Sequence, residues 1–306
     1  MSSLLVRGFS IPEWEEDRNY RGTPLILKDK VSIITGSSMG IGKGIAAGFA
    51  KEGAHLVLVA RNSPGLEIAK KEVGSHGTRI EIFPADVSRE KEVKSVVDFT
   101  LEEFGTIDIL VNCAGIYGPI GFVTDIDTEK WLEAININLC GTFICIKAVL
   151  PTMLKRKKGK IINLSGGGAA SPFPRFSAYG TSKAAVVRLT ETLAQEVKEY
   201  NIDVNAIAPG PVNTRLLDQA LEAGEAAGKE FLAKSIKQKQ EGGVPPEKVA
   251  ELAIFLASPE SDGLSGRLIS LLWDNWRDAP THLNEIMSSD VYTLRRIIPQ
   301  ERGYDW

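Results

Sequence analysis

Two side chains capable of acid–base chemistry, Tyr179 and Lys183, stand four residues apart at the start of a segment predicted to be one long helix. Apolar residues recur at helical spacing from 184 to 200. Positions i and i+4 share a helix face, so the Lys183 ammonium can stand beside the Tyr179 phenol, where a cation favours the phenolate. Lowering a phenol pKa from about 10 to about 7 takes roughly 4 kcal/mol. Tyr179 is therefore a candidate acid or base, although a packed ring beside a solvated charge has the same spacing.

A glycine-rich loop lies between the first strong strand, expected at 31–34, and a helix that continues to Ala50. Its glycines are spaced G-x-x-x-G-x-G. Glycines let the backbone approach a pyrophosphate, and the helix N-terminus adds amide N–H groups and a positive dipole. A tight turn can also carry glycines, but the strand–loop–helix order indicates a dinucleotide site. The predicted cofactor contacts in this loop are Gly36, Ser38, Met39, Gly40, Ile41 and Gly42.

The second expected strand, 55–59, ends in Ala60, Arg61 and Asn62. A carboxylate at this point would hold the ribose 2′-hydroxyl of NAD, and Ala60 offers none. Arg61 can instead meet the 2′-phosphate of NADP. The sequence therefore favours NADP(H) over NAD(H), with Arg61 and Asn62 as cofactor-binding residues. A solvated Arg61, with NAD(H) as the cofactor, is the alternative.

Strand and helix patterns alternate along the rest of the chain. Further strands are expected at 80–84, 107–111, 160–164, 203–208 and 268–272. Six or seven strands in this pattern predict an α/β fold, a single doubly wound, Rossmann-type parallel sheet with helices on both faces. One of the helices is expected to run from about Thr128 to Lys157. Such sheets bind their ligands at the carboxyl ends of the strands.

Three divisions of the chain are expected: an N-terminal extension or arm at 1–27, a dinucleotide-binding catalytic domain at 28–270 and a C-terminal extension at 271–306. The segment from Arg215 to Gln240 is charged and rich in alanine, which is typical of a helical lid.

Composition excludes several classes of function. A formal net charge of −3 over 306 residues gives no electrostatic case for nucleic acid or an anionic membrane. No uninterrupted apolar run approaches the roughly 20 residues that span a bilayer. The three cysteines, Cys113, Cys140 and Cys145, fall in apolar segments without metal-ligand spacing. They are expected to be reduced thiols of a cytoplasmic protein, and no metal site is predicted.

The ordered motifs resemble the short-chain dehydrogenase/reductase family over about residues 28 to 270. They are Thr35-Gly36-x-x-x-Gly40-Ile41-Gly42, Asn112-x-Ala114-Gly115, Asn138, Tyr179-x-x-x-Lys183 and Pro209-Gly210. The resemblance implies an NAD(P)-dependent oxidoreductase that moves a hydride between nicotinamide and a carbonyl or secondary alcohol. Such an enzyme is expected to act on a small molecule as a homodimer or homotetramer.

The same resemblance implies roles for individual residues. Tyr179 would give or take the proton. Lys183 would bind the nicotinamide ribose and lower the pKa of Tyr179, and Asn138 would position a water in a proton relay. The remaining implied cofactor contacts are Asp86, Val87, Asn112, Ala114, Gly115, Pro209, Gly210, Val212 and Thr214.

One position departs from the family pattern. The family usually places a serine thirteen residues before the tyrosine to hold the substrate's reacting oxygen, and here that position is Gly166. Ser165 is the neighbouring candidate catalytic residue, but adjacent side chains of a strand point to opposite faces. The expectation is that Ser165 is at best a partial substitute, and that backbone N–H groups or Arg175 are the other candidates.

Two rival functions follow from this departure: a non-catalytic dinucleotide sensor or scaffold, and a dehydratase or epimerase that recycles its cofactor. The C-terminal extension also departs from the family, with aromatic residues and the pair Arg295-Arg296. Packing at a subunit interface is the simpler interpretation of this extension. Contact of Arg175 or of the arginine pair with an anionic substrate is the alternative.

Overall fold

The computed structural model describes residues 25–74 and 76–306. The predicted N-terminal extension, 1–27, therefore lies almost entirely outside the described residues.

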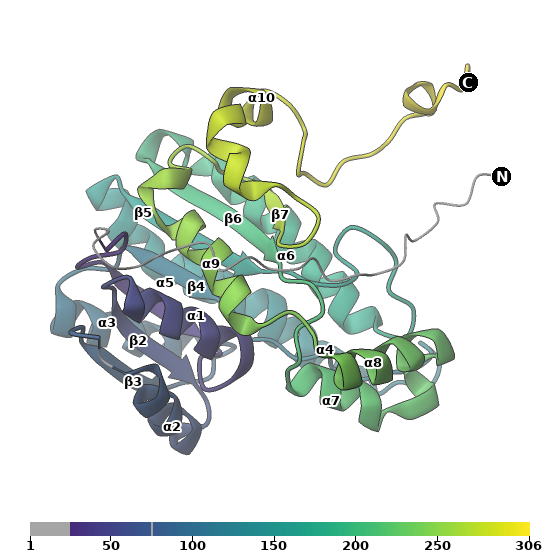
Figure 1. The fold of residues 1–306 in the computed structure, drawn as a ribbon, viewed down its shortest axis with the longest axis horizontal. Helices are drawn as coiled ribbons and strands as arrows, with labels where there is room; N and C mark the ends of the chain where they lie inside the picture. Colours follow the sequence, from purple (N-terminus) through teal and green to yellow (C-terminus); the bar gives the residue numbers. More distant parts are fainter. Residues whose placement is uncertain (1–24, 75) are drawn as a thin grey trace.

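Seven parallel strands form one sheet in the order β3-β2-β1-β4-β5-β6-β7, as Figure 1 shows. The strands are β1 (Val31–Thr35), β2 (His55–Ala60), β3 (Ile80–Pro84), β4 (Ile109–Asn112), β5 (Gly159–Leu164), β6 (Ile202–Ala208) and β7 (Leu268–Ser270). All five residues of β1 are buried, as expected for a strand covered on both faces. The strand order reverses between β1 and β4, which opens a crevice at the carboxyl ends of these two strands.

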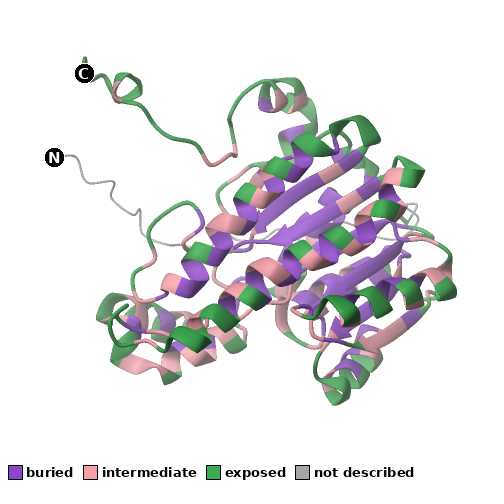
Figure 2. Cartoon of the chain, turned by 180° about the vertical axis from the view of Figure 1, so that it is seen from behind, coloured by how far each residue is buried: buried purple, intermediate pink, exposed green. Residues whose placement is uncertain are grey.

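Helices cover both faces of the sheet, so the predicted doubly wound fold is confirmed. One face packs against α1 (Gly40–Lys51), α2 (Ser63–Val73) and α9 (Pro246–Ala257). The other packs against α3 (Glu90–Phe104), α5 (Gly141–Arg156) and α6 (Ser177–Glu196). Figure 2 shows the buried strands enclosed between the two helical layers. The short helices α7 (Arg215–Glu222) and α8 (Lys229–Glu241) lie beside the carboxyl ends of the strands.

The helix expected from Thr128 to Lys157 is interrupted by one wide turn. It consists of α4 (Thr128–Ile135), a π-helical turn (Asn136–Cys140) and α5. The stretch Thr128–Arg156 has the length and apolar composition of a membrane-crossing helix, which the search for uninterrupted apolar runs missed. Within α5, Ile146, Val149 and Met153 are buried in the core beneath the sheet. The stretch is therefore a core helix of the domain.

The C-terminal extension continues past β7 through a 3-10 helix (Trp276–His282), α10 (Leu283–Met287) and a second 3-10 turn (Pro299–Arg302). Its first part is anchored to the domain, because the buried guanidinium of Arg267 donates to the carbonyl oxygens of Ile286 at 2.8 Å and Ser289 at 3.1 Å. After α10 the end of the extension leaves the body of the domain (Figure 1). There Arg295 pairs with Asp290 and Glu301 of the extension itself, so nothing directs it toward the strand ends.

Candidate active site

The loop after β1 has a conformation that only glycine can supply. Gly36 has φ +67°, and a Cβ added to it would lie 2.8 Å from the backbone nitrogen of Ala114. A Cβ on Gly42 would lie 2.4 Å from the carbonyl oxygen of Gly36. Real Cβ atoms do not approach backbone atoms so closely. The loop therefore folds tightly back on the first turn of α1 and against the segment that follows β4.

Two hydroxyl groups fix this loop to the neighbouring strands. Thr35 Oγ1 accepts hydrogen bonds from the backbone N–H groups of Cys113 at 3.0 Å and Ala114 at 3.2 Å. Ser37 Oγ accepts from the N–H of Val59 at 2.9 Å. The loop is thus bound to both β2 and the β4 end before any ligand arrives.

The N-terminus of α1 is open to an anion. Its N-cap, Met39, makes no side-chain capping hydrogen bond, and the first turn contains no acidic residue. The first amide N–H groups of a helix lack intrahelical partners, and the helix dipole favours negative charge there. These free donors, next to glycines that leave room for close approach, fit a dinucleotide pyrophosphate.

A groove of about 850 Å³ runs from this loop across the carboxyl ends of β1, β2 and β4. Most of the predicted cofactor contacts line it, namely Gly36, Ser38, Met39, Gly40, Ile41, Gly42, Arg61, Asn62, Asp86, Val87, Ala114, Gly115 and Thr214. The structure adds residues that no motif indicated, such as Ile120, Lys130, Glu133, Leu216 and Gln219. Several of these belong to α4 and α7, and only the tertiary structure brings those helices over the groove.

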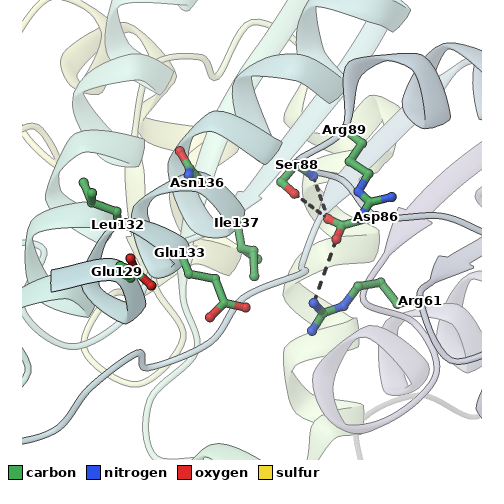
Figure 3. Close-up of a pocket in the computed structure, with 9 residues that line it drawn as sticks. All are labelled: Arg61, Asp86, Ser88, Arg89, Glu129, Leu132, Glu133, Asn136 and Ile137. Atoms are coloured by element: carbon green, nitrogen blue, oxygen red, sulfur yellow. Dashed lines mark hydrogen bonds and ion pairs between the residues drawn. The ribbon is translucent and has the colours of Figure 1, made fainter. Parts of the chain in front are cut away.

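A second cavity, of about 390 Å³, adjoins the groove at Arg61 and Asp86 (Figure 3). Arg61 lies 3.9 Å from the Asp86 carboxylate, and Glu133 and Ile137 face them from the opposite wall. Burial alone would raise the pKa of Asp86, but hydrogen bonds from Ser88 and the charge of Arg61 outweigh it and lower that pKa. Asp86 is therefore an anion at neutral pH, and the exposed guanidinium groups of Arg61 and Arg89 are cations of this cavity.

A substitution in the loop tests this part of the site. In Gly42→Ala the new methyl collides with the Gly36 carbonyl, so we expect NADPH affinity to fall at least about tenfold. Fluorescence titration of NADPH measures the change, and the melting temperature reports folding. Lys43→Ala, one residue further along α1, is the matched control, because its side chain pairs with Glu72 at the surface. Unchanged affinity in Gly42→Ala would contradict the assignment of the loop.

Lys183 and Asn138 meet behind Gly115, a residue that lines the groove, and neither they nor Tyr179 is among the lining residues. A Cβ on Gly115 would lie 3.2 Å from Asn138 Oδ1 and 3.5 Å from Lys183 Nζ, so the three residues converge. The Lys183 ammonium donates to the carbonyl oxygen of Leu164 at 2.7 Å. Burial lowers the pKa of Lys183 to about 8, which makes the group easy to neutralise.

Asn138 acts as a clamp on the segment after β4. Its Oδ1 accepts from the N–H of Ile116 at 2.9 Å, and its Nδ2 donates to the Ile116 carbonyl and to Ser182 Oγ, each at 2.9 Å. Asn138 lies in a π-helical turn, and such turns occur frequently at functional sites. The structure gives Asn138 a positioning contact, and its implied role in a water relay stays a prediction.

Tyr179 lies beside Lys183 in a buried environment. Lys183 Nζ lies 5.5 Å from the Tyr179 ring centroid. Burial raises the pKa of Tyr179 well above its usual range, and the neighbouring Tyr117 and Cys113 raise it further. Removal of water from the phenolate is the largest cause of this raised pKa. The implied lowering of the Tyr179 pKa by Lys183 stays a prediction.

The burial of Tyr179 comes from an aromatic cluster, which we define as Tyr117, Phe173, Phe176 and Phe231. Phe173 stacks on Phe176 at 4.3 Å between ring centroids, and Phe231 of α8 meets Phe176 at 4.8 Å. Apolar side chains of α7 and the turn after it complete the cover. Only 7% of Tyr179 is exposed as a result.

Gly166 lies directly against Tyr179. A Cβ on Gly166 would lie 2.3 Å from the Tyr179 hydroxyl oxygen, so the phenol occupies the space of a side chain at this position. Ser165 is buried, and its recorded hydrogen bond is a long one of 3.5 Å to the carbonyl oxygen of Lys183. This contact directs Ser165 toward the α6 backbone, consistent with the expectation that it substitutes poorly. Arg175 places its guanidinium 3.4 Å from the Phe122 ring centroid.

Six predicted contacts are not among the residues that line the groove, namely Tyr179, Lys183, Asn112, Pro209, Gly210 and Val212. Asn112 donates through Nδ2 to Asn163 Oδ1 at 2.9 Å and so ties β4 to β5. Val212 forms an isolated bridge with Val244, and Gly210, after Pro209, has φ +77° and contacts Leu272. Their direct contact with a cofactor stays a prediction.

Comparison with known proteins agrees with this geometry. A family model described as short chain dehydrogenase matches residues 30–224. The oxidoreductase UcpA of Salmonella typhimurium is 40% identical over 245 residues, which cover 78% of this chain and 92% of that protein. A crystal structure of NAD+-bound xylitol dehydrogenase has a TM-score of 0.74 at 29% identity and covers 80% of this chain and 98% of that one. A crystal structure of an actinorhodin polyketide ketoreductase with NADPH has a TM-score of 0.73 at 29% identity and covers 79% and 95%.

The doubly wound fold is thus shared with a solved dehydrogenase and a solved reductase along most of their length. The chain belongs to the short-chain dehydrogenase/reductase family and is an oxidoreductase of that family.

Proposed function

We propose that the protein is an NADP(H)-preferring dehydrogenase/reductase that acts on the carbonyl or secondary alcohol of a small molecule. The observation that carries this proposal is that Lys183 and Asn138 converge on Gly115, a lining residue of the glycine-rich groove, and that Tyr179 lies beside Lys183. When bound in the groove, the cofactor's nicotinamide supplies or accepts a hydride. The α1 N-terminus would hold the pyrophosphate, Arg61 the 2′-phosphate and Lys183 the nicotinamide ribose.

The protonation states support the reductive direction. A phenol with a raised pKa stays protonated at neutral pH, so Tyr179 is ready to donate its proton to a carbonyl oxygen that gains negative charge. Oxidation of an alcohol needs the phenolate, which the buried site disfavours. A cofactor and a substrate that bring polar groups to Tyr179 would reduce this penalty.

The aromatic cluster indicates the character of the substrate. A carbonyl compound at Tyr179 must occupy the space that the cluster and the α7–α8 cover now fill. Apolar and aromatic walls favour a substrate with an apolar or aromatic body next to its carbonyl group. Substrate entry would require α7 and α8 to move outward, in agreement with the lid expected at 215–240.

The rival functions make different predictions. A sensor would bind NADPH without turning over any ketone, aldehyde or alcohol. A dehydratase or epimerase would purify with bound cofactor and show no net redox change. Titration of NADPH followed by assays with a panel of aromatic and alicyclic ketones distinguishes the three functions. Steady consumption of NADPH supports the proposal, and tight binding without consumption by any ketone would overturn it.

Cofactor preference is tested at Arg61. Loss of a charge-assisted hydrogen bond to the 2′-phosphate costs about 1.5–3 kcal/mol, so Arg61→Ala should weaken NADPH binding at least about tenfold and leave NADH binding unchanged. Arg302→Ala, at an exposed turn of the C-terminal extension, is the control. Equal affinities for NADPH and NADH in the wild type, both unaffected by Arg61→Ala, would contradict the preference.

We also propose a cytoplasmic homodimer or homotetramer. The free thiols of Cys113, Cys140 and Cys145 support a reducing compartment. Two large apolar side chains on the helices α4 and α5, Leu132 and Phe143, are about half exposed, which supports association through that surface.

A further inference from the structure

The missing side chain at Gly166 leaves the reacting oxygen of a substrate with one side-chain donor, Tyr179. Catalysis of carbonyl reduction benefits from a second donor, because negative charge develops on this oxygen in the transition state. A second donor would have to come from another polar group near Tyr179. Ser165 and Arg175 have contacts that direct them elsewhere.

Tyr117 is the polar group that remains. Its ring meets the Tyr179 ring edge to face, with 4.8 Å between centroids and 81° between planes. Within the described part of the chain, no recorded hydrogen bond uses the Tyr117 hydroxyl, and this atom is not among the fully buried unpaired ones. A phenol beside the candidate acid thus has a free donor.

The position of Tyr117 is fixed from two sides. Asn138 bonds both the N–H and the carbonyl of Ile116, the residue immediately before it, at 2.9 Å. On the other side the Tyr117 ring packs edge to face on Phe176, with centroids 5.0 Å apart. A donor held in this way loses little entropy when it bonds a substrate. Asn138, Tyr117 and Tyr179 therefore form one connected unit.

We propose that the Tyr117 hydroxyl is the second hydrogen-bond donor to the substrate's reacting oxygen, in place of the side chain that Gly166 lacks. The assignment rests on the proposed carbonyl chemistry. In reduction, the carbonyl carbon gains a hydride from NADPH and the oxygen gains the proton of Tyr179. Ketone, NADPH and one proton thus give alcohol and NADP+, and Tyr179 is reprotonated from solvent. Tyr117 donates its hydrogen bond throughout and keeps its proton.

Chemistry at neutral pH agrees with this role. Burial raises the pKa of Tyr117 to about 12, so the phenol stays protonated and can only donate or accept hydrogen bonds. The two neighbouring phenols thus have different roles. Tyr179 transfers its proton, and Tyr117 stabilises the negative charge that develops on the substrate's reacting oxygen.

The test is Tyr117→Phe, which keeps the ring and its packing and removes the hydroxyl alone. With NADPH and phenanthrenequinone, a planar aromatic dicarbonyl, kcat/KM should fall about a hundredfold, while NADPH affinity and melting temperature stay at wild-type values. Tyr200→Phe is the matched control, because Tyr200 lies at an exposed turn after α6. In a protein that already carries Tyr179→Phe, adding Tyr117→Phe should lower kcat/KM by much less than a further hundredfold. The two effects are not additive because both hydroxyls act on the same substrate oxygen.

A second measurement does not depend on turnover. Benzamide has an aromatic body and a carbonyl that NADPH does not reduce. Its binding to the enzyme–NADPH complex, followed by cofactor fluorescence, should weaken about fivefold in Tyr117→Phe through the loss of one hydrogen bond. If the wild type binds NADPH but reduces no ketone, the proposed function is overturned. The role of Tyr117 is then decided separately, by comparing the benzamide affinities of the wild type and Tyr117→Phe. Catalytic rates within threefold of wild type, or benzamide affinity equal in the two proteins, would overturn the Tyr117 assignment.

Discussion

Tyr179→Phe should reduce carbonyl turnover about a thousandfold and leave NADPH affinity nearly unchanged. General acid catalysis by a positioned side chain typically contributes between about 10² and 10⁴ in rate, and phenylalanine cannot donate a proton. The substituted ring keeps its contacts with Tyr117 and Phe173, so the fold should be preserved. Single-turnover rates with NADPH and a ketone, together with NADPH titration and the melting temperature, measure the three effects separately.

Lys183→Met provides the comparison that assigns roles to the two residues. The ammonium is expected to bond the nicotinamide ribose, so its loss should weaken NADPH binding as well as turnover. Tyr179→Phe should affect turnover alone. A Tyr179→Phe enzyme that works at near-normal rate would refute the acid assignment. An enzyme whose cofactor affinity falls as far as its rate would show that the phenol contributes mainly to binding.

Gly166→Ser should also lower the rate about a hundredfold or more, although it restores the residue type usual in the family. The added Cβ would lie 2.3 Å from the Tyr179 hydroxyl and 3.1 Å from the Tyr179 Cζ atom. The Tyr179 ring cannot easily move away, because Tyr117 and the rest of the aromatic cluster enclose it. Overpacking of this kind costs about 1–3 kcal/mol and displaces the acid from its working position. A displacement of about 1 Å at a reacting group can cost a hundredfold in rate.

The neighbouring glycine supplies the matched control. A Cβ on Gly167 would have its closest contact, with Phe173, at 3.4 Å, which is an ordinary van der Waals distance. Gly167→Ser should therefore leave both stability and rate nearly at wild-type values. Rates and melting temperatures of the two serine variants, measured side by side, separate the collision with Tyr179 from any general effect of a serine in this loop. A Gly166→Ser enzyme faster than the wild type would show that the loop can adopt the arrangement usual in the family, and that Tyr117 is not needed.

The expected effects of Gly166→Ser and Gly167→Ser depend on how the loop of residues 166–168 packs against α6. The loop of residues 166–168 lies very close to the first turn of α6, where a Cβ on Gly168 would lie 2.7 Å from the Gly180 Cα. This close approach lets the Tyr179 hydroxyl sit over the Gly166 backbone. Tyr179 thus lies between the Gly166 backbone and the Tyr117 ring.

Local sequence patterns were sufficient to predict the fold. Strand, glycine loop and helix follow one another in a fixed order, and each element is encoded by its own periodicity within about ten residues. The position of the cofactor groove follows from this order, because parallel strands bring their carboxyl ends to one edge. The glycine loop, Arg61 and the segment 112–115 could therefore be assigned to the same region without coordinates. Gly166 was likewise evident from the sequence as a departure.

The tertiary structure decided what surrounds the reacting groups. Tyr117, Phe173 and Phe231 come from three separate segments, and no local pattern shows that they enclose Tyr179. The pKa of a buried phenol depends on how much water all of its neighbours exclude, which is a sum over residues distant in sequence. For this reason the spacing of Tyr179 and Lys183 correctly indicated that the two side chains are neighbours, but it could not show that burial raises the pKa of Tyr179. The sequence by itself thus determined the fold and which residues are candidates for the chemistry. Only the packing of distant segments determined the burial of Tyr179 and placed Tyr117 beside it.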